Sequence, residues 1–261
     1  MDIGFLKRQI SELITHCDGR VGVVIETQEG RIEVNGAERF SAASLIKIPI
    51  LIEGFRQSDH GVLNLEEYLP ALPSNRVGGA GVLQALSEDL KLKIIDLMVL
   101  MIIVSDNTAT NLLINRLGKN KIKQCMKTLN LQNTELNRKM MDFEAMKNGL
   151  DNFTSANDMV TCLKVINQHS FLSKESSEKA FGILAKQQFK NKLSNRIDLE
   201  MVKVASKTGE LPGIEHDCAI LKHGSKTVYA AILIDQLSEQ DDGRKTLAQI
   251  GNLLSRYMIN D

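Results

Sequence analysis

The chain carries no excess of charge of either sign. Its 261 residues include 32 lysines and arginines and 32 aspartates and glutamates, so its formal net charge at pH 7 is zero. Proteins that bind nucleic acid or an anionic membrane electrostatically carry a basic surface. We therefore expect neither nucleic acid nor a membrane surface as a partner.

The sequence also lacks a long apolar run. A membrane-spanning helix needs ~18 or more apolar residues, and the apolar stretch Leu97–Val104 is far shorter. The N-terminal segment Met1–Cys17 has the periodicity of an amphipathic helix, without the basic and then apolar regions of a signal peptide. We expect a cytoplasmic protein or, alternatively, an exported one whose signal is absent from this chain.

Closely spaced metal-ligating residues are missing as well. The four cysteines form no C-x-x-C pair and the five histidines form no H-E-x-x-H pattern, so zinc-site spacing is absent. We predict no metal and no cofactor. The cysteines are interpreted as reduced, mostly buried thiols, which fits a reducing compartment; they are Cys17, Cys125, Cys162 and Cys218.

Strand patterns occur near both ends of the chain. Alternating β-branched residues on either side of Gly30 predict a β-hairpin of Val21–Thr27 and Arg31–Val34. The strand pattern returns only late in the chain and is followed by a closing helix; these segments are Met201–Lys207, Cys218–Lys222, Thr227–Asp235 and the helix Asp242–Met258.

The middle of the chain has helical periodicity throughout. The predicted helices are Ala42–Ser58, Leu90–Val104, Thr108–Leu117, Lys119–Leu129, a capped helix from Ser155 to Gln168, and Lys174–Gln188. We predict a single α/β (α+β) domain over residues 1–261 with two lobes. Residues 1–36 and 193–261 form an antiparallel sheet flanked by helices, and residues 37–192 form an inserted all-α lobe. Such a layout places a cleft between the lobes, where binding sites tend to form.

Three short motifs follow one another along this framework. They are Ser44-x-x-Lys47, Ser105-Asp106-Asn107 and Lys207-Thr208-Gly209. Each alone is common enough to occur by chance. A second S-x-x-K, from Ser176 to Lys179, lies in a polar amphipathic stretch and is interpreted as such a coincidence. All three in order, each at the end or start of a predicted element, indicate a functional set.

The first motif has the chemistry of an activated nucleophile. On a helix, Ser44 and Lys47 share a face because they are three residues apart. We expect Ser44 in the first turn, where free backbone N–H groups include its own as an oxyanion donor. A serine hydroxyl needs a base to accept its proton, and Lys47 can serve if burial keeps its amine neutral.

The other two motifs supply partners for that nucleophile. Ser105 follows a rigid apolar helix and could relay a proton to a leaving group, while Asn107 could hold Lys47 or a substrate amide. Asp106 is expected to cap the next helix. In the third motif, which we place at a strand end, Lys207 offers positive charge and Thr208 a hydroxyl to a substrate carboxylate. Gly209 would let substrate backbone approach closely.

The three motifs together resemble those of class A β-lactamases and penicillin-binding proteins. Gly78–Gln84 and Met101–Asn111 also resemble that family's segment leading through its S-D-N turn, so the resemblance covers nearly the whole chain. It implies a β-lactamase-like two-lobe fold and Ser44 as the acylated nucleophile. It also implies Lys47 as base or proton shuttle, Ser105 as catalytic, and substrate binding by Asn107, Lys207 and Thr208. A second oxyanion donor would be a backbone N–H past Gly209, near Glu210 or Leu211.

One feature departs from the family pattern. Class A enzymes place the glutamate that activates the deacylating water two residues after an arginine, on a loop that an aspartate closes by pairing with that arginine. The corresponding segment here runs from Arg138 to Asp151, and Met140 stands at the glutamate's place. Asp142 and Glu144 lie nearby, either as solvated loop carboxylates or as substitutes for the missing base. His216 is a further candidate substrate contact, in the neighbourhood where some class A enzymes carry a basic residue.

Three functions remain open from the sequence. The chain is a serine hydrolase that opens β-lactams or related amides or esters, with slow release of the acyl group. Alternatively it is a penicillin-binding or sensing module that is acylated without turnover, or a cytoplasmic serine amidase on the same fold. In each case we expect a monomer acting on a small-molecule, β-lactam or peptide-like substrate.

Overall fold

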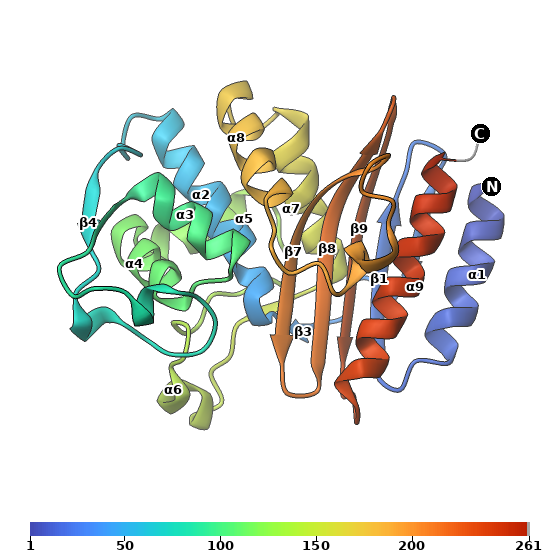
Figure 1. Cartoon of the computed structure of the whole chain (residues 1–261), viewed down its shortest axis with the longest axis horizontal. Helices are drawn as coiled ribbons and strands as arrows, with labels where there is room; N and C mark the ends of the chain where they lie inside the picture. The colour runs from blue at the N-terminus through green and yellow to red at the C-terminus, as the bar shows by residue number, and fades with distance from the viewer. Residues whose placement is uncertain (260–261) are drawn as a thin grey trace.

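The computed structural model describes residues 1–259 and is built around one five-stranded antiparallel sheet. Its strand order is β2-β1-β9-β8-β7, so the first hairpin of the chain pairs with strands from its last quarter (Figure 1). The prediction of one sheet from both chain ends is therefore confirmed. The strands are β1 Arg20–Glu26, β2 Arg31–Val34, β7 Lys203–Leu211, β8 Ile214–His223 and β9 Lys226–Asp235.

Strand β7 corrects the sequence analysis, which ended this strand at Lys207. It continues through Thr208 and Gly209 to Leu211, which pairs with Ile214 across the turn into β8. Glycine weakens a strand by propensity alone, and the pairing with β8 overrides that local preference. The third motif thus lies within an edge strand of the sheet and not beyond its end.

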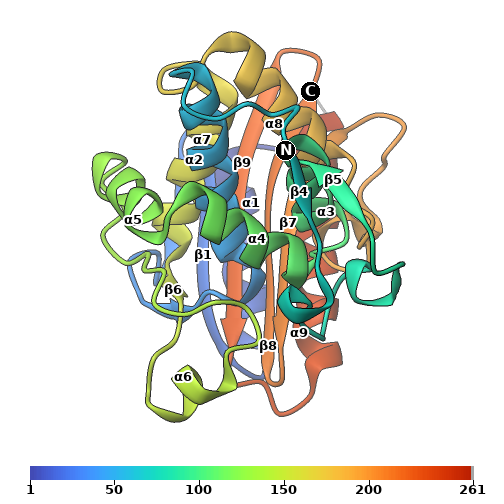
Figure 2. The same ribbon diagram turned by 90° about the vertical axis from the view of Figure 1, so that its left-hand side faces the viewer.

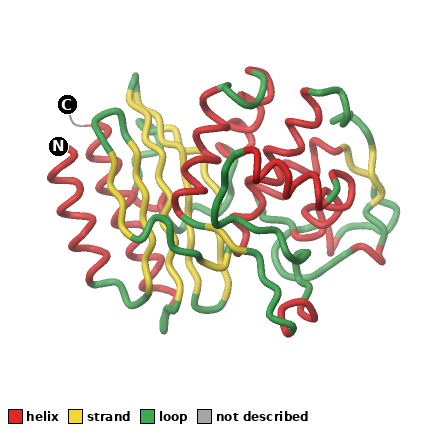
Figure 3. The backbone as a smooth tube through the Cα atoms, turned by 180° about the vertical axis from the view of Figure 1, so that it is seen from behind, coloured by secondary structure: helices red, strands yellow, loops and turns green. Residues whose placement is uncertain are grey.

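Two helices from opposite ends of the chain cover one face of the sheet. α1, Ile3–Thr15, packs beside α9, Gln240–Ile259, as Figures 1 and 3 show. Apolar residues of both helices and of the sheet form one hydrophobic cluster, which includes Leu6, Ile232 and Leu254. The pairing of the two chain ends is therefore held by apolar burial as well as by strand hydrogen bonds.

The helical part of the chain lies on the other side of the sheet (Figure 2). At its centre is α2, Lys47–Asp59, whose residues from Lys47 to Phe55 are all buried. Around it are α3 Ile94–Ile103, α4 Asn107–Leu117, α5 Lys119–Thr128, the short α6 Phe143–Lys147, α7 Ala156–Gln168 and α8 Lys174–Ala185. A second hydrophobic cluster joins these helices to the sheet. The exact lobe boundaries stay a prediction.

Short elements connect these layers. Small two-stranded pairings are formed by β3 Phe40–Ser41 with β6 Phe153–Thr154, and by β4 Tyr68–Pro70 with β5 Lys91–Lys93. Four 3₁₀ segments are η1 Ala43–Ile46, η2 Pro73–Asn75, η3 Leu83–Ala85 and η4 Leu193–Arg196. None of the helices described over residues 1–259 is both long and apolar enough to cross a membrane.

The helix limits follow local capping chemistry. The Ser155 side chain accepts from the backbone N–H of Asp158 at the start of α7, as the sequence predicts. The segment predicted as one helix from Ala42 is divided, because η1 precedes α2. α3 begins at Ile94, since Lys91–Lys93 pair as a strand, and α8 ends at Ala185 instead of Gln188.

Candidate active site

Ser44 lies on η1, the 3₁₀ segment before α2, and not in the first turn of an α-helix as predicted. In a 3₁₀ helix, side chains three residues apart are eclipsed, so Ser44 still faces Lys47. The hydroxyl of Ser44 accepts from Lys47 Nζ at 3.0 Å and from Ser105 Oγ at 2.8 Å. The residue before it, Ala43, has a positive φ of 44°, a conformation that is costly for a side-chain-bearing residue.

Lys47 is fully buried and is surrounded by neutral acceptors. Its Nζ donates to the hydroxyl of Ser105 at 2.9 Å, the carbonyl of Ser105 at 2.7 Å and Oδ1 of Asn107 at 2.9 Å, besides Ser44. Within the described part of the chain it has no ion-pair partner. Burial, together with the nearby Lys207 ammonium, holds the pKa of Lys47 well below its usual range. A neutral amine beside the serine hydroxyl is the state that a general base requires.

The second motif forms a turn that the side chain of Asp106 holds through hydrogen bonds. The carboxylate of Asp106 caps α4 by accepting from Ala109 N at 2.9 Å, as predicted. It also accepts from the backbone N–H groups of Val82 at 2.7 Å and Leu83 at 2.9 Å. Ser105 itself has a positive φ of 55°. The buried carboxylate thus holds a strained turn in the orientation that aims Ser105 at Ser44.

Lys207 approaches the same hydroxyl cluster from strand β7. Its Nζ donates to Ser105 Oγ at 3.2 Å and to the carbonyl of Thr208 at 2.8 Å. Burial lowers the pKa of Lys207 to about 7, and the charge of Lys192 contributes in the same direction. The structure therefore brings Ser44, Lys47, Ser105, Asn107 and Lys207 into one hydrogen-bonded network, with Thr208 buried beside it.

Gly209 lies close to the segment that carries Ser44, and its predicted contact with substrate stays a prediction. A Cβ at this position would lie 3.3 Å from Leu45 Cγ, 3.4 Å from Ala43 Cβ and 3.2 Å from His216 Cβ. The first and last of these side chains, Leu45 and His216, would be closer than an ordinary van der Waals contact. The glycine therefore lets η1, which carries Ser44, approach the strand.

Glu210 and His216 were expected as substrate contacts. The half-exposed carboxylate of Glu210 pairs with Arg244 at 3.1 Å and with Lys192 at 3.4 Å, so its side chain is held by protein cations. His216 is fully buried. Its Nδ1 accepts from Ile234 N at 3.1 Å, so its Nε2 donates to the carbonyl of Ser41 at 2.9 Å.

The expectation of a substrate contact at His216 is therefore corrected. Both ring nitrogens of His216 are engaged within the protein, and burial lowers its pKa to about 4. The ring is neutral at pH 7 and supplies no positive charge to a substrate. No local pattern marks this burial, because β8 is covered on both faces only when the layers have assembled.

The loop from Arg138 to Asp151 is closed as expected. Arg138 is buried and its guanidinium pairs with Asp151 at 2.7 Å. Met140 is held by its backbone, which donates to Asn111 Oδ1 at 2.8 Å and accepts from Asn111 Nδ2 at 3.1 Å, and its side chain joins the helical core. The thioether of Met141 instead lies near Gly79: a Cβ at that glycine would be 2.9 Å from Met141 Sδ and 2.8 Å from Asn107 Nδ2.

Neither of the two candidate loop acids joins the network around Ser44. Asp142 caps the short helix α6 by accepting from Ala145 N at 3.0 Å, and Glu144 is exposed on that helix, which projects from the molecule (Figure 2). Among residues 1–259, no carboxylate is hydrogen-bonded to Ser44, Lys47, Ser105 or Lys207.

The second S-x-x-K copy is structural. Ser176 donates to Asp59 Oδ1 at 2.6 Å and so fastens α8 to the end of α2, while the exposed Lys179 pairs with Glu175 at 2.7 Å. The four cysteines are free thiols, as predicted. In the part of the chain that is described, His, Cys, Asp and Glu form no group suited to hold a metal ion.

Sequence reasoning missed two buried ionisable residues behind the site. Lys192 is buried before η4 and its Nζ donates to the carbonyl of Gly209 at 2.7 Å. Asp217 is buried on β8, accepts from Leu193 N at 3.1 Å, and has its pKa raised to about 7 by burial. No motif or periodicity marks either residue, because their burial depends on how η4 packs against the sheet.

Comparison with known proteins agrees with this geometry. The sequence matches the β-lactamase enzyme family over residues 5–258. A β-lactamase from Sphaerobacter thermophilus is 26% identical and superposes with a TM-score of 0.89, covering 99% of this chain and 98% of that one. A protein described as PBP-A is also 26% identical, with a TM-score of 0.88 and coverage of 98% and 96%.

An ancestral class A β-lactamase, GNCA, shares the fold at 22% identity, with a TM-score of 0.88 and coverage of 97% of this chain and 99% of that one. No curated protein matches the sequence. The family match spans nearly the whole chain, and the solved structures share its class A architecture from end to end. The chain therefore belongs to the β-lactamase enzyme family and is a serine hydrolase of the class A type.

Proposed function

We propose that the protein opens a β-lactam amide, or a related amide or ester, by forming an acyl-enzyme on Ser44, and that it releases the acyl group slowly. One observation carries this proposal. The Ser44 hydroxyl lies 3.0 Å from the buried amine of Lys47 and 2.8 Å from Ser105 Oγ, in a network that lacks any carboxylate over residues 1–259. Proton acceptors for acylation are in place, and a base for deacylation is not.

Acylation follows from these contacts. The neutral amine of Lys47 takes the proton of Ser44 as its oxygen attacks the substrate carbonyl carbon. The C–N bond then breaks, and Ser105 passes a proton to the departing nitrogen while Lys47 or Lys207 replaces it through their hydrogen bonds to Ser105 Oγ. The products are a Ser44 ester and an opened ring that carries the amine. The ammonium of Lys207 and the hydroxyl of Thr208 are suited to hold a substrate carboxylate.

Slow release follows from the loop that ends at Asp151. Hydrolysis of the ester needs a water activated by a base. Met140 belongs to the helical core, and Met141 brings an apolar thioether close to Gly79. Asp142 is used as a helix cap. A variant of PBP-A in which glutamate replaces leucine is described as an acyl-enzyme complex with penicillin G, so a covalent adduct forms on this fold in a relative.

The test is incubation with penicillin G, followed by intact mass measured over time. We expect a mass increase equal to one penicillin on the wild-type chain, persisting for many minutes, and none on Ser44→Ala. Asp142→Asn and Glu144→Gln should leave the decay of the adduct unchanged. No adduct on the wild-type chain would contradict the proposal, and fast turnover of a chromogenic cephalosporin would contradict slow release. An adduct that never decays would identify a penicillin-sensing module.

The rate of acylation should depend on pH through two lysines with opposite requirements. Lys47 must be neutral, so the rate rises with pH through its lowered pKa. Lys207 must be charged to hold a carboxylate, so the rate falls as pH rises above about 7. The second-order rate constant measured against pH gives a bell-shaped curve. A penicillin methyl ester, which lacks the carboxylate, serves as control. If the ester shows the same alkaline fall, Lys207 does not act through the substrate carboxylate.

A further inference from the structure

Lys192 is a buried lysine that the proposed acylation does not use. It precedes η4, its side chain is 2% exposed, and its Nζ donates to the carbonyl of Gly209 at 2.7 Å. The same Nζ pairs with the fully buried Glu215 and lies 3.4 Å from Glu210 Oε2. Its charge is thus enclosed by protein acceptors, which excludes direct contact with a substrate.

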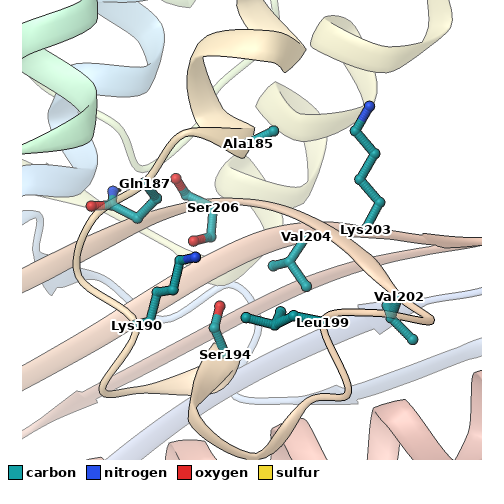
Figure 4. Close-up of a pocket in the computed structure, with 9 residues that line it drawn as sticks. All are labelled: Ala185, Gln187, Lys190, Ser194, Leu199, Val202, Lys203, Val204 and Ser206. Carbon is teal, nitrogen blue, oxygen red and sulfur yellow. Dashed lines mark hydrogen bonds between the residues drawn. The ribbon is translucent and has the colours of Figure 1, made fainter.

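The direction of the peptide after Gly209 follows from strand alternation. In an antiparallel ladder, successive residues direct their N–H and C=O groups alternately toward the paired strand and away from it. The carbonyl of Ser206 accepts from the side chain of Gln187, which lies outside the sheet, at 3.4 Å; Figure 4 shows the two residues side by side. The backbone N–H and C=O groups of the even-numbered residues of β7 therefore point to its free edge. Glu210 is one of these residues.

The N–H of Glu210 thus faces outward, while Leu211 faces β8. Of the two candidates for the second oxyanion donor, Glu210 and Leu211, this direction favours Glu210. No peptide bond within residues 1–259 is cis, so the carbonyl of Gly209 points opposite to the N–H of Glu210 in the same planar unit. Gly209 also lies against Ala43 and Leu45, the neighbours of Ser44. The segments that carry the peptide N–H groups of Ser44 and Glu210 are therefore neighbours.

A pocket near this edge is separate from the site. It has a volume of about 180 Å³, and its lining residues are Ala185, Gln187, Lys190, Ser194, Leu199, Val202, Lys203, Val204 and Ser206. Figure 4 shows it along the upstream part of β7. Its lining shares no residue with the hydrogen-bonded network around Ser44.

We infer that Lys192 is a positioning residue that polarises the Gly209–Glu210 peptide and so strengthens the N–H of Glu210 as an oxyanion donor. A cation at the carbonyl end of a peptide draws electron density away from its N–H, and hydrogen bonds in a chain reinforce one another in a low dielectric. The bond to a charged donor is also stronger than a neutral one and fixes the peptide plane. The inference rests on the proposed acylation of Ser44.

Lys192 can be replaced by a neutral residue without leaving the buried Glu215 carboxylate unpaired. Arg244 Nε lies 2.9 Å from Glu215 Oε1, so this carboxylate still has a cationic partner in such a variant. Lys203 offers a matched control. It begins the same strand, is exposed, and lies over the ring of Phe181 at 5.1 Å, far along β7 from Gly209.

The experiment compares Lys192→Met with Lys203→Met in the full chain. Rapid mixing with a chromogenic cephalosporin separates the dissociation constant of the non-covalent complex from the acylation rate. Infrared difference spectra give the stretching frequency of the acyl-ester carbonyl on Ser44. For Lys192→Met we expect an acylation rate about tenfold lower, a fraction of the loss on deleting an oxyanion donor. The dissociation constant should be unchanged and the carbonyl frequency higher, because the carbonyl is less polarised. Lys203→Met should change none of these.

The experiment distinguishes a failure of the inference about Lys192 from a failure of the proposed acylation of Ser44. An unchanged carbonyl frequency in folded Lys192→Met overturns the inference, whether or not the rate falls, because a structural role would lower only the active fraction. If Lys192→Met does not fold, Lys192→Gln carries the same test, since its neutral amide still donates to Gly209; an unchanged frequency there also overturns it. Failure of the proposed function is distinct, because the wild-type chain would then form no ester to observe.

Discussion

Replacing Lys47 with methionine is expected to lower the rate of Ser44 acylation by about 10³-fold, within the range that general-base catalysis contributes. Methionine keeps the length and burial of the side chain but cannot accept a proton. The amine of Lys47 lies 3.0 Å from Ser44 Oγ, and its neutral state is favoured by burial. The rate of adduct formation by intact mass, measured from pH 5 to pH 9, checks this expectation. A rate within threefold of wild type would show that another group accepts the proton.

The same variant should also be more stable at neutral pH. A buried amine whose folded pKa is lowered destabilises the fold at every pH below the unfolded value of 10.5. The penalty is full below the folded pKa and declines to zero as pH rises from the folded pKa to 10.5. Lys47→Met should therefore raise the free energy of unfolding by about 1–3 kcal/mol at pH 7, as when buried charges are replaced by apolar groups. Urea unfolding at pH 7 and pH 10 measures the difference, which should shrink at the higher pH. Lys245→Met, at an exposed lysine, is the control and should show neither effect.

Asp106→Ala is expected to be the most destabilising substitution near the site. Its carboxylate accepts three backbone N–H groups, those of Val82, Leu83 and Ala109, within 2.9 Å, and it is 1% exposed. Alanine leaves these donors without partners, and each unsatisfied buried group costs about 1–3 kcal/mol. We expect the free energy of unfolding to fall by about 3–5 kcal/mol, measured by urea unfolding with the slope checked for two-state behaviour.

The substitution should affect acylation as well. Asp106 ties the turn of Ser105 to the segment before η3, so the Ser105 hydroxyl would lose its fixed distance to Ser44. Asp106→Asn retains one acceptor oxygen and should lose roughly half as much stability. A change below about 1 kcal/mol for Asp106→Ala would mean that water replaces the carboxylate, which the burial of Leu83 N argues against.

Local sequence was sufficient for most of the elements and for the residues that meet at the site. The alternation of Arg31–Val34 and of the late strands depends on side-chain period alone. Ser155 and Asp106 were identified as caps because capping needs only a few neighbouring residues. The three motifs name Ser44, Lys47, Ser105, Asn107 and Lys207, and the structure joins these five through hydrogen bonds.

The errors occurred where distant parts of the chain override local preference. Pairing with β8 extends β7 past Gly209. η1 lies so close to Gly209 that a side chain at this position would crowd it. His216 was expected to contact substrate, yet its hydrogen bonds with two backbone groups and its full burial make it part of the interior. Asp142 and Glu144 are close in sequence to Met140, which stands at the family glutamate's place. In the fold, however, Asp142 caps a helix and Glu144 is exposed, so neither joins the network around Ser44.

The sequence by itself identified the residues that meet at the candidate site and indicated the family, because a spacing of three residues and short motifs are local properties. Tertiary structure decided the electrostatics of the site. The lowered pKa of Lys47, the value of about 7 for Lys207 and the hydrogen bond from Lys192 to Gly209 all arise from burial between layers that lie far apart in the chain. Desolvation depends on every atom around a charge, and those atoms come together only when the sheet and the helices have packed.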